Sequence, residues 1–182
     1  MRYLKTFEDN SASIINDFFY KKCISNAKQS KSKSERYGAI VVKNGEILGE
    51  GFNRAIVHPK FKLDRFLKQG YANHAEVEAL NDAITKGYDV SDSDIYVAGY
   101  FTKTKTLFFK QQFTCKLCIP YFKKFNIKNI YVPLPDKWNK RTVQNCVEDS
   151  VLFHRGNMHN DRLNVSVGDY KLSLLENKKL YD

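Results

Sequence analysis

Apolar and polar residues follow two different periods in the first third of the chain. Between residues 11 and 29, apolar side chains recur at helical spacing and predict an amphipathic helix, capped by Asn10 or Ser11. Residues 39–42 and 47–50 then predict two strands, joined through Asn44-Gly45, a dipeptide suited to a tight primed hairpin turn. The residues expected on the buried side of the helix are Ile14, Ile15, Phe18, Phe19, Cys23 and Ile24.

Two helices and two strands are predicted in the middle of the chain. Residues 75–84 are good helix formers with apolar side chains at helical spacing, and Gly87 is suited to end this helix. Residues 95–98 and 130–132 predict strands. Because a helix reaching residue 125 lies between these strands in sequence, they are expected to be parallel.

This order of elements predicts an α/β fold, a three-layer α/β/α sheet flanked by helices. At 182 residues, the chain is expected to form one domain over residues 1–182. Residues 52–73 are expected to form a long connection, and the pattern is weaker over 136–182. The elements expected in these two regions are a helix at 61–67, a helix at 141–150 and a strand at 151–154.

One histidine and two cysteines have the spacing of metal ligands. His74 and Glu76 lie at the start of the predicted 75–84 helix, and Cys115 and Cys118 are three residues apart on one face of the next helix. One imidazole and two thiolates are one ligand short of the zinc tetrahedron, and catalytic zinc sites keep that position for water. Since Glu76 is not needed as a ligand, we expect it to transfer protons.

Other interpretations of these residues stay open. A closed structural zinc site would use Cys146 or His58 as fourth ligand, and the chain would then be a nucleic-acid-binding protein. Cys23 and Cys146 are otherwise expected to be buried or free thiols. Glu78 faces away from Glu76 on the same helix and is expected to be solvated.

The His-x-Glu and Cys-x-x-Cys motifs, at His74 to Glu76 and Cys115 to Cys118, resemble the signature of the cytidine/deoxycytidylate deaminase superfamily of zinc-dependent nucleobase deaminases. The resemblance covers about residues 37–132. It departs at Thr114, where the family has proline, and in a longer stretch before the cysteines. The resemblance implies a cytidine deaminase-like sheet, a Zn²⁺ cofactor and a hydrolase that removes an amino group from a nucleobase.

The resemblance also implies substrate contacts. Asn53 matches the asparagine that is expected to contact the sugar hydroxyl, although an asparagine here is also suited to a turn. Backbone groups at Ala75 and around Thr114 are expected to bind the base edge. From the residues alone, Tyr100 and Phe101 are the candidates for the base pocket, because they open a segment rich in aromatic residues and lysine. Packing in the core is the alternative for these aromatic residues.

Charge favours an anionic substrate. The chain has 30 Lys+Arg against 20 Asp+Glu, a net charge of +10, and residues 95–135 contain seven lysines but no acidic residue. Because a positive field attracts phosphate, we expect a cytosine nucleoside or nucleotide, with dCMP favoured. The alternative is a deaminase of tRNA adenosine or of cytosine in RNA or single-stranded DNA, since residues 51–54 resemble a run in tRNA adenosine deaminases. A second basic run, residues 21–36, has a solvated helix face as its alternative interpretation.

Neither a signal peptide nor an apolar run of membrane-spanning length, about 20 residues, is found in the sequence. We therefore expect a cytoplasmic enzyme of nucleotide metabolism that does not associate with membranes. Relatives in the superfamily are commonly oligomers, which suggests a homo-oligomer.

Overall fold

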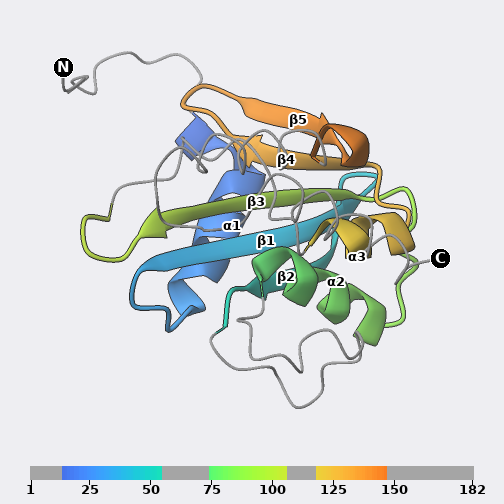
Figure 1. Cartoon of the computed structure of the whole chain (residues 1–182). Helices are drawn as coiled ribbons and strands as arrows, with labels where there is room; N and C mark the ends of the chain where they lie inside the picture. Colours follow the sequence, from blue (N-terminus) through green and yellow to red (C-terminus); the bar gives the residue numbers. More distant parts are fainter. Residues whose placement is uncertain (1–13, 55–73, 106–117, 147–182) are drawn as a thin grey trace, which may run out of the picture.

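A five-stranded sheet forms the centre of the molecule (Figure 1). The structure is a computed structural model that describes residues 14–54, 74–105 and 118–146. Neighbouring strands in the order β2-β1-β3-β4-β5 are antiparallel except for β3 and β4, which are parallel as the predicted crossover requires. The strands are β1 (Glu35–Lys43), β2 (Glu46–Phe52), β3 (Asp94–Phe101), β4 (Asn129–Pro133) and β5 (Trp138–Thr142).

Helices cover both faces of this sheet. Helix α1 (Phe18–Gln29), preceded by the short 3-10 helix η1 (Ile14–Asn16), packs on one face, and α2 (Ala75–Thr85) and α3 (Ile119–Lys124) pack on the other. Side chains alternate along β1, so Ala39 and Val41 enter the core under α2 and α3 while Ile40 and Val42 enter the core under α1. The three-layer prediction is confirmed. In the part of the chain described, no helix has both the length and the apolarity to cross a membrane.

The predicted hairpin and the predicted end of the 75–84 helix are both confirmed. Asn44 and Gly45 have φ angles of 52° and 84°, as a tight primed turn requires. Both strands of the hairpin are longer than predicted. Helix α2 ends at Thr85, and Gly87 follows with φ 88°, where its N–H donates to the carbonyl of Ile84.

Helix α1 begins later than predicted, and Phe18 does not face the core. Its N-cap is Asp17, whose side chain accepts a hydrogen bond from Tyr20 N at 2.9 Å. Phe18 is 65% exposed. A Cβ at Gly38 would lie 2.0 Å from the carbonyl oxygen of Cys23, so α1 turns its Cys23 side toward the sheet. Phe18, five residues earlier, points about 140° away from Cys23 around the helix.

Strand β5 was missed by the sequence pattern. It is Trp-Asn-Lys-Arg-Thr at the edge of the sheet, and an edge strand with polar side chains has no apolar alternation to recognise. The helix predicted at 141–150 overlaps the end of this strand, and residues 143–146 are helical. The elements predicted at 61–67 and 151–154 lie outside the described residues.

Candidate active site

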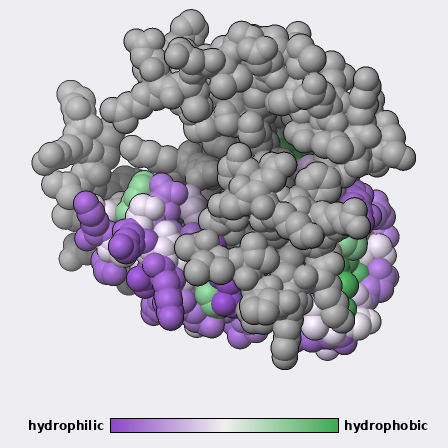
Figure 2. All heavy atoms as spheres, turned by 60° about the horizontal axis from the view of Figure 1, so that its bottom comes forward, coloured by the Kyte–Doolittle hydropathy of each residue, from purple (hydrophilic) through white to green (hydrophobic). Residues whose placement is uncertain are grey.

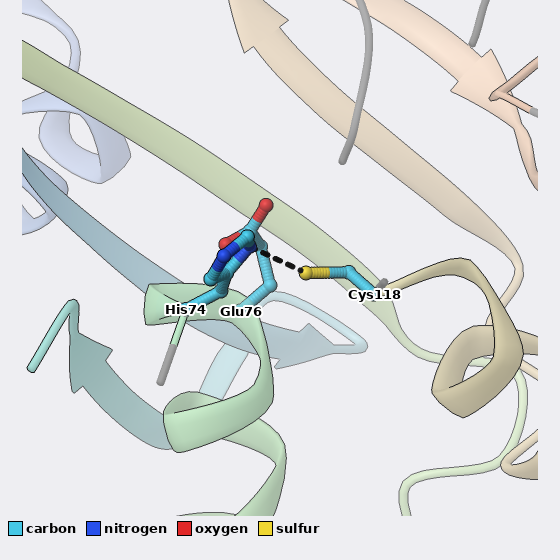
Figure 3. A group of neighbouring side chains, drawn as sticks. All are labelled: His74, Glu76 and Cys118. Carbon is cyan, nitrogen blue, oxygen red and sulfur yellow. Dashed lines mark hydrogen bonds between the residues drawn. The ribbon is translucent and has the colours of Figure 1, made fainter. Parts of the chain in front are cut away.

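Two helix starts bring three of the predicted side chains together on the α2 and α3 side of the sheet (Figure 3). His74 is the N-cap of α2, Glu76 lies in its first turn, and Cys118 directly precedes α3. The ligand atoms of these side chains all lie within 4.8 Å of one another. Glu76 and Cys118 are buried and His74 is half-buried, so the group is sheltered on its inner side.

The distance between the Cys118 sulfur and the His74 imidazole fits a shared metal ion. Zinc bonds of about 2.3 Å to sulfur and 2.0 Å to nitrogen, at a tetrahedral angle, place the two donor atoms roughly 3.5 Å apart. Cys118 Sγ lies 3.3 Å from His74 Nδ1. Cys115, the third predicted ligand, lies outside the described residues, as does His58. Within the described ranges, Cys146 is buried in the same core but is not part of the group, whereas Glu76, which is, offers a carboxylate oxygen as a possible ligand.

A glycine in β2 fixes the position of the helix that carries His74 and Glu76. A Cβ at Gly51 would lie 2.3 Å from Ala79 N and 2.5 Å from Ala75 O, so only a residue without a side chain lets α2 rest on the strand. Ala75 is fully buried at this contact. The backbone N–H of Ala75 lies in the first turn of α2, where N–H groups have no acceptor within the helix. A contact between this N–H and a base edge, as predicted, requires such a donor. Thr114, predicted for the same role, lies outside the described residues.

Glu78 is buried rather than solvated, which makes that prediction wrong. Arg54 Nε lies 3.6 Å from Glu78 Oε2, and the Arg54 guanidinium stacks 4.0 Å from the centre of the Phe52 ring. Glu78 is only 7% exposed. Two residues along a helix turn a side chain by about 200°, which directs Glu78 toward the end of β2. Arg54 belongs to the run of residues 51–54 that resembles tRNA adenosine deaminases. In this structure it contacts Glu78 and Phe52 of its own chain.

Asn53 holds the start of β1. Its Oδ1 accepts a hydrogen bond from Tyr37 N at 2.9 Å, and its Nδ2 donates to Glu35 O at 3.0 Å. The backbone N–H of Asn53 also donates to Tyr37 O. These bonds join Asn53 to strand β1, and Asn53 is not among the described residues with a positive φ, so they do not support the alternative of a turn asparagine with an unusual backbone angle. Each end of the amide retains capacity for a second hydrogen bond, so contact with a sugar hydroxyl stays a prediction.

Strand alternation separates Tyr100 from its neighbour Phe101. Val97 belongs to the core under α2 and α3, and Ala98 to the core under α1. Alternation then places Phe101 on the metal-site side and Tyr100 on the other side. This placement favours Phe101 over Tyr100 as the aromatic residue nearer the site. Sequence reasoning also missed Tyr37, which packs against the core under α2 and α3 and could have been found by its period-two spacing from Ala39.

The sequence matches a family model over most of the described structure. Residues 14–134 match the cytidine and deoxycytidylate deaminase zinc-binding region. The chain belongs to this deaminase family. The match includes the hairpin, His74, Glu76 and both cysteines of the Cys-x-x-Cys motif, and it extends beyond the range of about 37–132 that the motifs alone suggested. No curated protein matches the chain.

Several solved structures are distantly similar. The dCMP deaminase from the cyanophage S-TIM5 in apo form is 22% identical, with a TM-score of 0.43, over 64% of this chain and 79% of that chain. The cytidine deaminase from Burkholderia pseudomallei is 17% identical, with a TM-score of 0.48, over 70% and 92%. A diaminohydroxyphosphoribosylaminopyrimidine deaminase/5-amino-6-(5-phosphoribosylamino)uracil reductase from Thermotoga maritima is 25% identical, with a TM-score of 0.38, over 72% and 32%.

Proposed function

We propose that this member of the family is a zinc-dependent hydrolytic deaminase that converts the cytosine of a nucleoside or nucleotide to uracil. Water adds to the ring carbon, the carbon–nitrogen bond to the exocyclic amine breaks, and ammonia leaves. The observation that supports this reaction is the convergence of His74, Glu76 and Cys118 within 4.8 Å. An imidazole, a thiol and a spare carboxylate are the groups that such a reaction requires.

His74, Cys115 and Cys118 are the residues that would hold the metal. Their donor atoms, one nitrogen and two sulfurs, suit zinc, and the 3.3 Å between His74 Nδ1 and Cys118 Sγ is compatible with a shared ion. Zinc bound there would lower the pKa of a water molecule to about 7. His74 and Cys118 are the N-cap residues of α2 and α3, so the starts of two helices would present them to the metal.

Glu76 would act as general base and then as general acid. Its carboxylate, 7% exposed, lies with the metal-ligand group at the start of α2. We expect it to accept the proton of the attacking water, pass it to the ring nitrogen and help protonate the departing ammonia. Burial keeps bulk water from competing for these protons. The two oxygens of one carboxylate allow both transfers without a second titratable residue.

A dCMP-type substrate is favoured because the 95–135 segment is positive throughout, with seven lysines and no acidic residue. The test is ammonia release from dCMP, deoxycytidine, cytidine and a tRNA, with the purified protein and its zinc content measured in parallel. We expect release from dCMP at the highest kcat/KM, and at least ~10²-fold less in Glu76→Gln with zinc retained. Release from the tRNA alone would assign the site to polynucleotides. No release from any cytosine substrate, with zinc bound, would contradict the proposal.

A further inference from the structure

Two loops meet at the end of the sheet where β1 begins and β3 ends. Residues 30–34 connect α1 to β1, and residues 102–105 form a turn after β3. Thr102 N donates to Ser34 O at 2.9 Å, and Thr102 Oγ1 donates to Ser32 O at 3.3 Å. The bond between Thr102 and Ser32 joins two residues that are 70 positions apart in the sequence.

The first of these loops is anchored beside the candidate active site. Ser30, only 2% exposed, donates from its hydroxyl to Asn53 O at 2.8 Å and accepts from Ser32 N at 3.2 Å. Arg36 Nε donates to Ser32 O at 3.3 Å. Asn53 lies two residues after Gly51, on which the first turns of α2 rest. The loop is therefore attached to the strand that positions His74 and Glu76.

Four exposed lysines extend from these two loops. Lys31, Lys33, Lys103 and Lys105 are exposed, and no ion pair joins any of them to a carboxylate among the described residues. Lys105 Nζ lies 5.6 Å from the centre of the Tyr100 ring, and Glu35 is the acidic residue that lies opposite Phe101 in the β1–β3 register. Other lysines are paired: Lys22 with Glu50, Lys43 with Asp89 and Lys86 with Asp82. Neighbouring positive charges repel each other, and a bound polyanion would neutralise this repulsion. The grouping is thus matched to a ligand with several negative charges.

A partly exposed aromatic residue directly precedes the second of these loops. Phe101 directly precedes the 102–105 turn, is 41% exposed and lies on the metal-site side of β3. We call Lys31, Lys33, Phe101, Lys103 and Lys105 the basic platform. In Figure 2, the described surface on the left, where Figure 1 places this end of the sheet, is largely hydrophilic with a small hydrophobic area. Lysines beside an exposed aromatic ring are the combination that binds single-stranded nucleic acids.

We propose that the basic platform binds the backbone of a single-stranded nucleic acid, with Phe101 stacked against a base. Four lysines on two separate loops are more than one phosphate can occupy, so the geometry favours a chain of phosphates over a mononucleotide. Binding at this surface goes beyond the proposed deamination. It does not require Glu76 or turnover, and a strand without cytosine is expected to bind as well.

The test is equilibrium binding of a fluorescent 20-nucleotide polythymidine strand across a range of salt concentrations. In Lys31→Gln/Lys33→Gln/Lys103→Gln/Lys105→Gln, the log–log salt slope should become shallower by about 3, or 0.7 for each phosphate that a lysine no longer neutralises. The matched control, which removes the same four charges from exposed sites elsewhere, is Lys21→Gln/Lys123→Gln/Lys128→Gln/Lys140→Gln. This control should keep the parent slope to within about 1. Equal weakening in the two variants, or no binding by the parent protein, would overturn the proposal.

Phe101→Ala tests stacking separately. It should lower the affinity about 5-fold to 150-fold, the range for removal of one base–aromatic stack. Phe18→Ala, which removes the 65% exposed aromatic residue at the start of α1, should leave the affinity unchanged. Tight binding of a duplex of the same length, or displacement of the strand by millimolar dTMP, would overturn the assignment to single strands. Glu76→Gln should bind the strand like the parent, so failure of deamination and failure of the platform are distinguishable.

Discussion

Cys118 and Cys23 are both fully buried thiols, but they lie on opposite faces of the sheet and have different neighbours. Cys118 Sγ lies 3.3 Å from the imidazole of His74 and in one group with Glu76. Cys23 Sγ donates to the backbone carbonyl of Tyr96 at 3.4 Å. Burial therefore does not distinguish a predicted metal ligand from a packing residue. The imidazole and carboxylate near the Cys118 sulfur set it apart from Cys23.

The α1 face is organised by packing and holds its thiol in the neutral form. Burial raises the pKa of Cys23 well above its ordinary value, and the charges of Asp17 and Glu50 add to this effect. Beside this core, the Tyr96 and Tyr131 rings stack at 4.4 Å with an interplanar angle of 8°. A neutral, enclosed thiol is a poor nucleophile and a poor metal ligand. The two buried cysteines thus differ in the groups that surround the sulfur.

The largest expected effect comes from removing each of these cysteines in turn. Cys118→Ala removes a predicted zinc ligand, so bound zinc should fall close to zero and ammonia release should fall with it. Cys23→Ala should retain zinc and turnover and lose about 1–2 kcal/mol of unfolding free energy through poorer packing. Metal analysis, ammonia release and urea unfolding check these outcomes. Loss of zinc in both variants would mean that the α1 face also supports the metal site.

Two glycines permit a second comparison of the faces. A Cβ at Gly51 would lie 2.3 Å from Ala79 N in α2, and one at Gly38 would lie 2.0 Å from Cys23 O in α1. We expect Gly51→Ala and Gly38→Ala each to lower the unfolding free energy by about 3 kcal/mol, because backbone must move in both. Gly51→Ala should also lower turnover per folded molecule, since α2 carries His74 and Glu76. An equal loss of specific activity in Gly38→Ala would contradict the prediction that only the α2 face positions the catalytic residues.

The residues of the metal group could be predicted because their signals are local. Motif spacing identifies His74, Glu76 and Cys118, and the apolar period of the following residues predicts the helix that presents the first two. The hairpin turn at Asn44-Gly45 is equally local. These features depend on a few neighbouring residues, and the fold brings the two motifs together.

What the sequence did not predict depends on contacts between distant segments. Glu78 looks like a solvated helix residue until β2 places Arg54 beside it. Phe18 continues an apolar helical pattern, but the contact at Gly38 rotates α1 and leaves Phe18 exposed. Strand β5 forms because β4 offers an edge, not because its own sequence alternates. Such positions follow from tertiary packing, which a periodic pattern does not encode.

A smaller effect is expected at the pair that joins β2 to the outer side of α2. Glu78→Gln removes the charge that faces Arg54 at 3.6 Å, and it should lower the unfolding free energy by about 1 kcal/mol, since the Arg54 side chain is 35% exposed and solvent screens the pair. Turnover should stay within about threefold of the parent. A double-mutant cycle with Arg54→Leu measures the coupling energy. A coupling near zero, or a loss of turnover comparable to that of Glu76→Gln, would contradict this assignment.

The last effect concerns alkaline pH and belongs to the α1 face. Burial raises the pKa of Tyr20 to about 12 and also raises the pKa values of Cys23 and Tyr96. The folded chain then keeps protons that the unfolded chain releases above about pH 8.5 for cysteine and pH 10 for tyrosine. Stability is therefore fully present below these values and falls as the pH rises above them.

Each such group contributes a slope of about 1.4 kcal/mol per pH unit. Urea unfolding between pH 8 and pH 10 should show this decline in the parent protein. Cys23→Ala should make the decline shallower by up to that amount, because the group that titrates first in the unfolded chain is gone. Ser25→Ala, a change at an exposed and uncharged position of α1, should leave the slope unchanged. An identical slope in Cys23→Ala and the parent would mean that the Cys23 thiol ionises as readily in the folded chain as in the unfolded one. The contrast between Cys23 and Cys118 would then rest on the geometry of their neighbours alone.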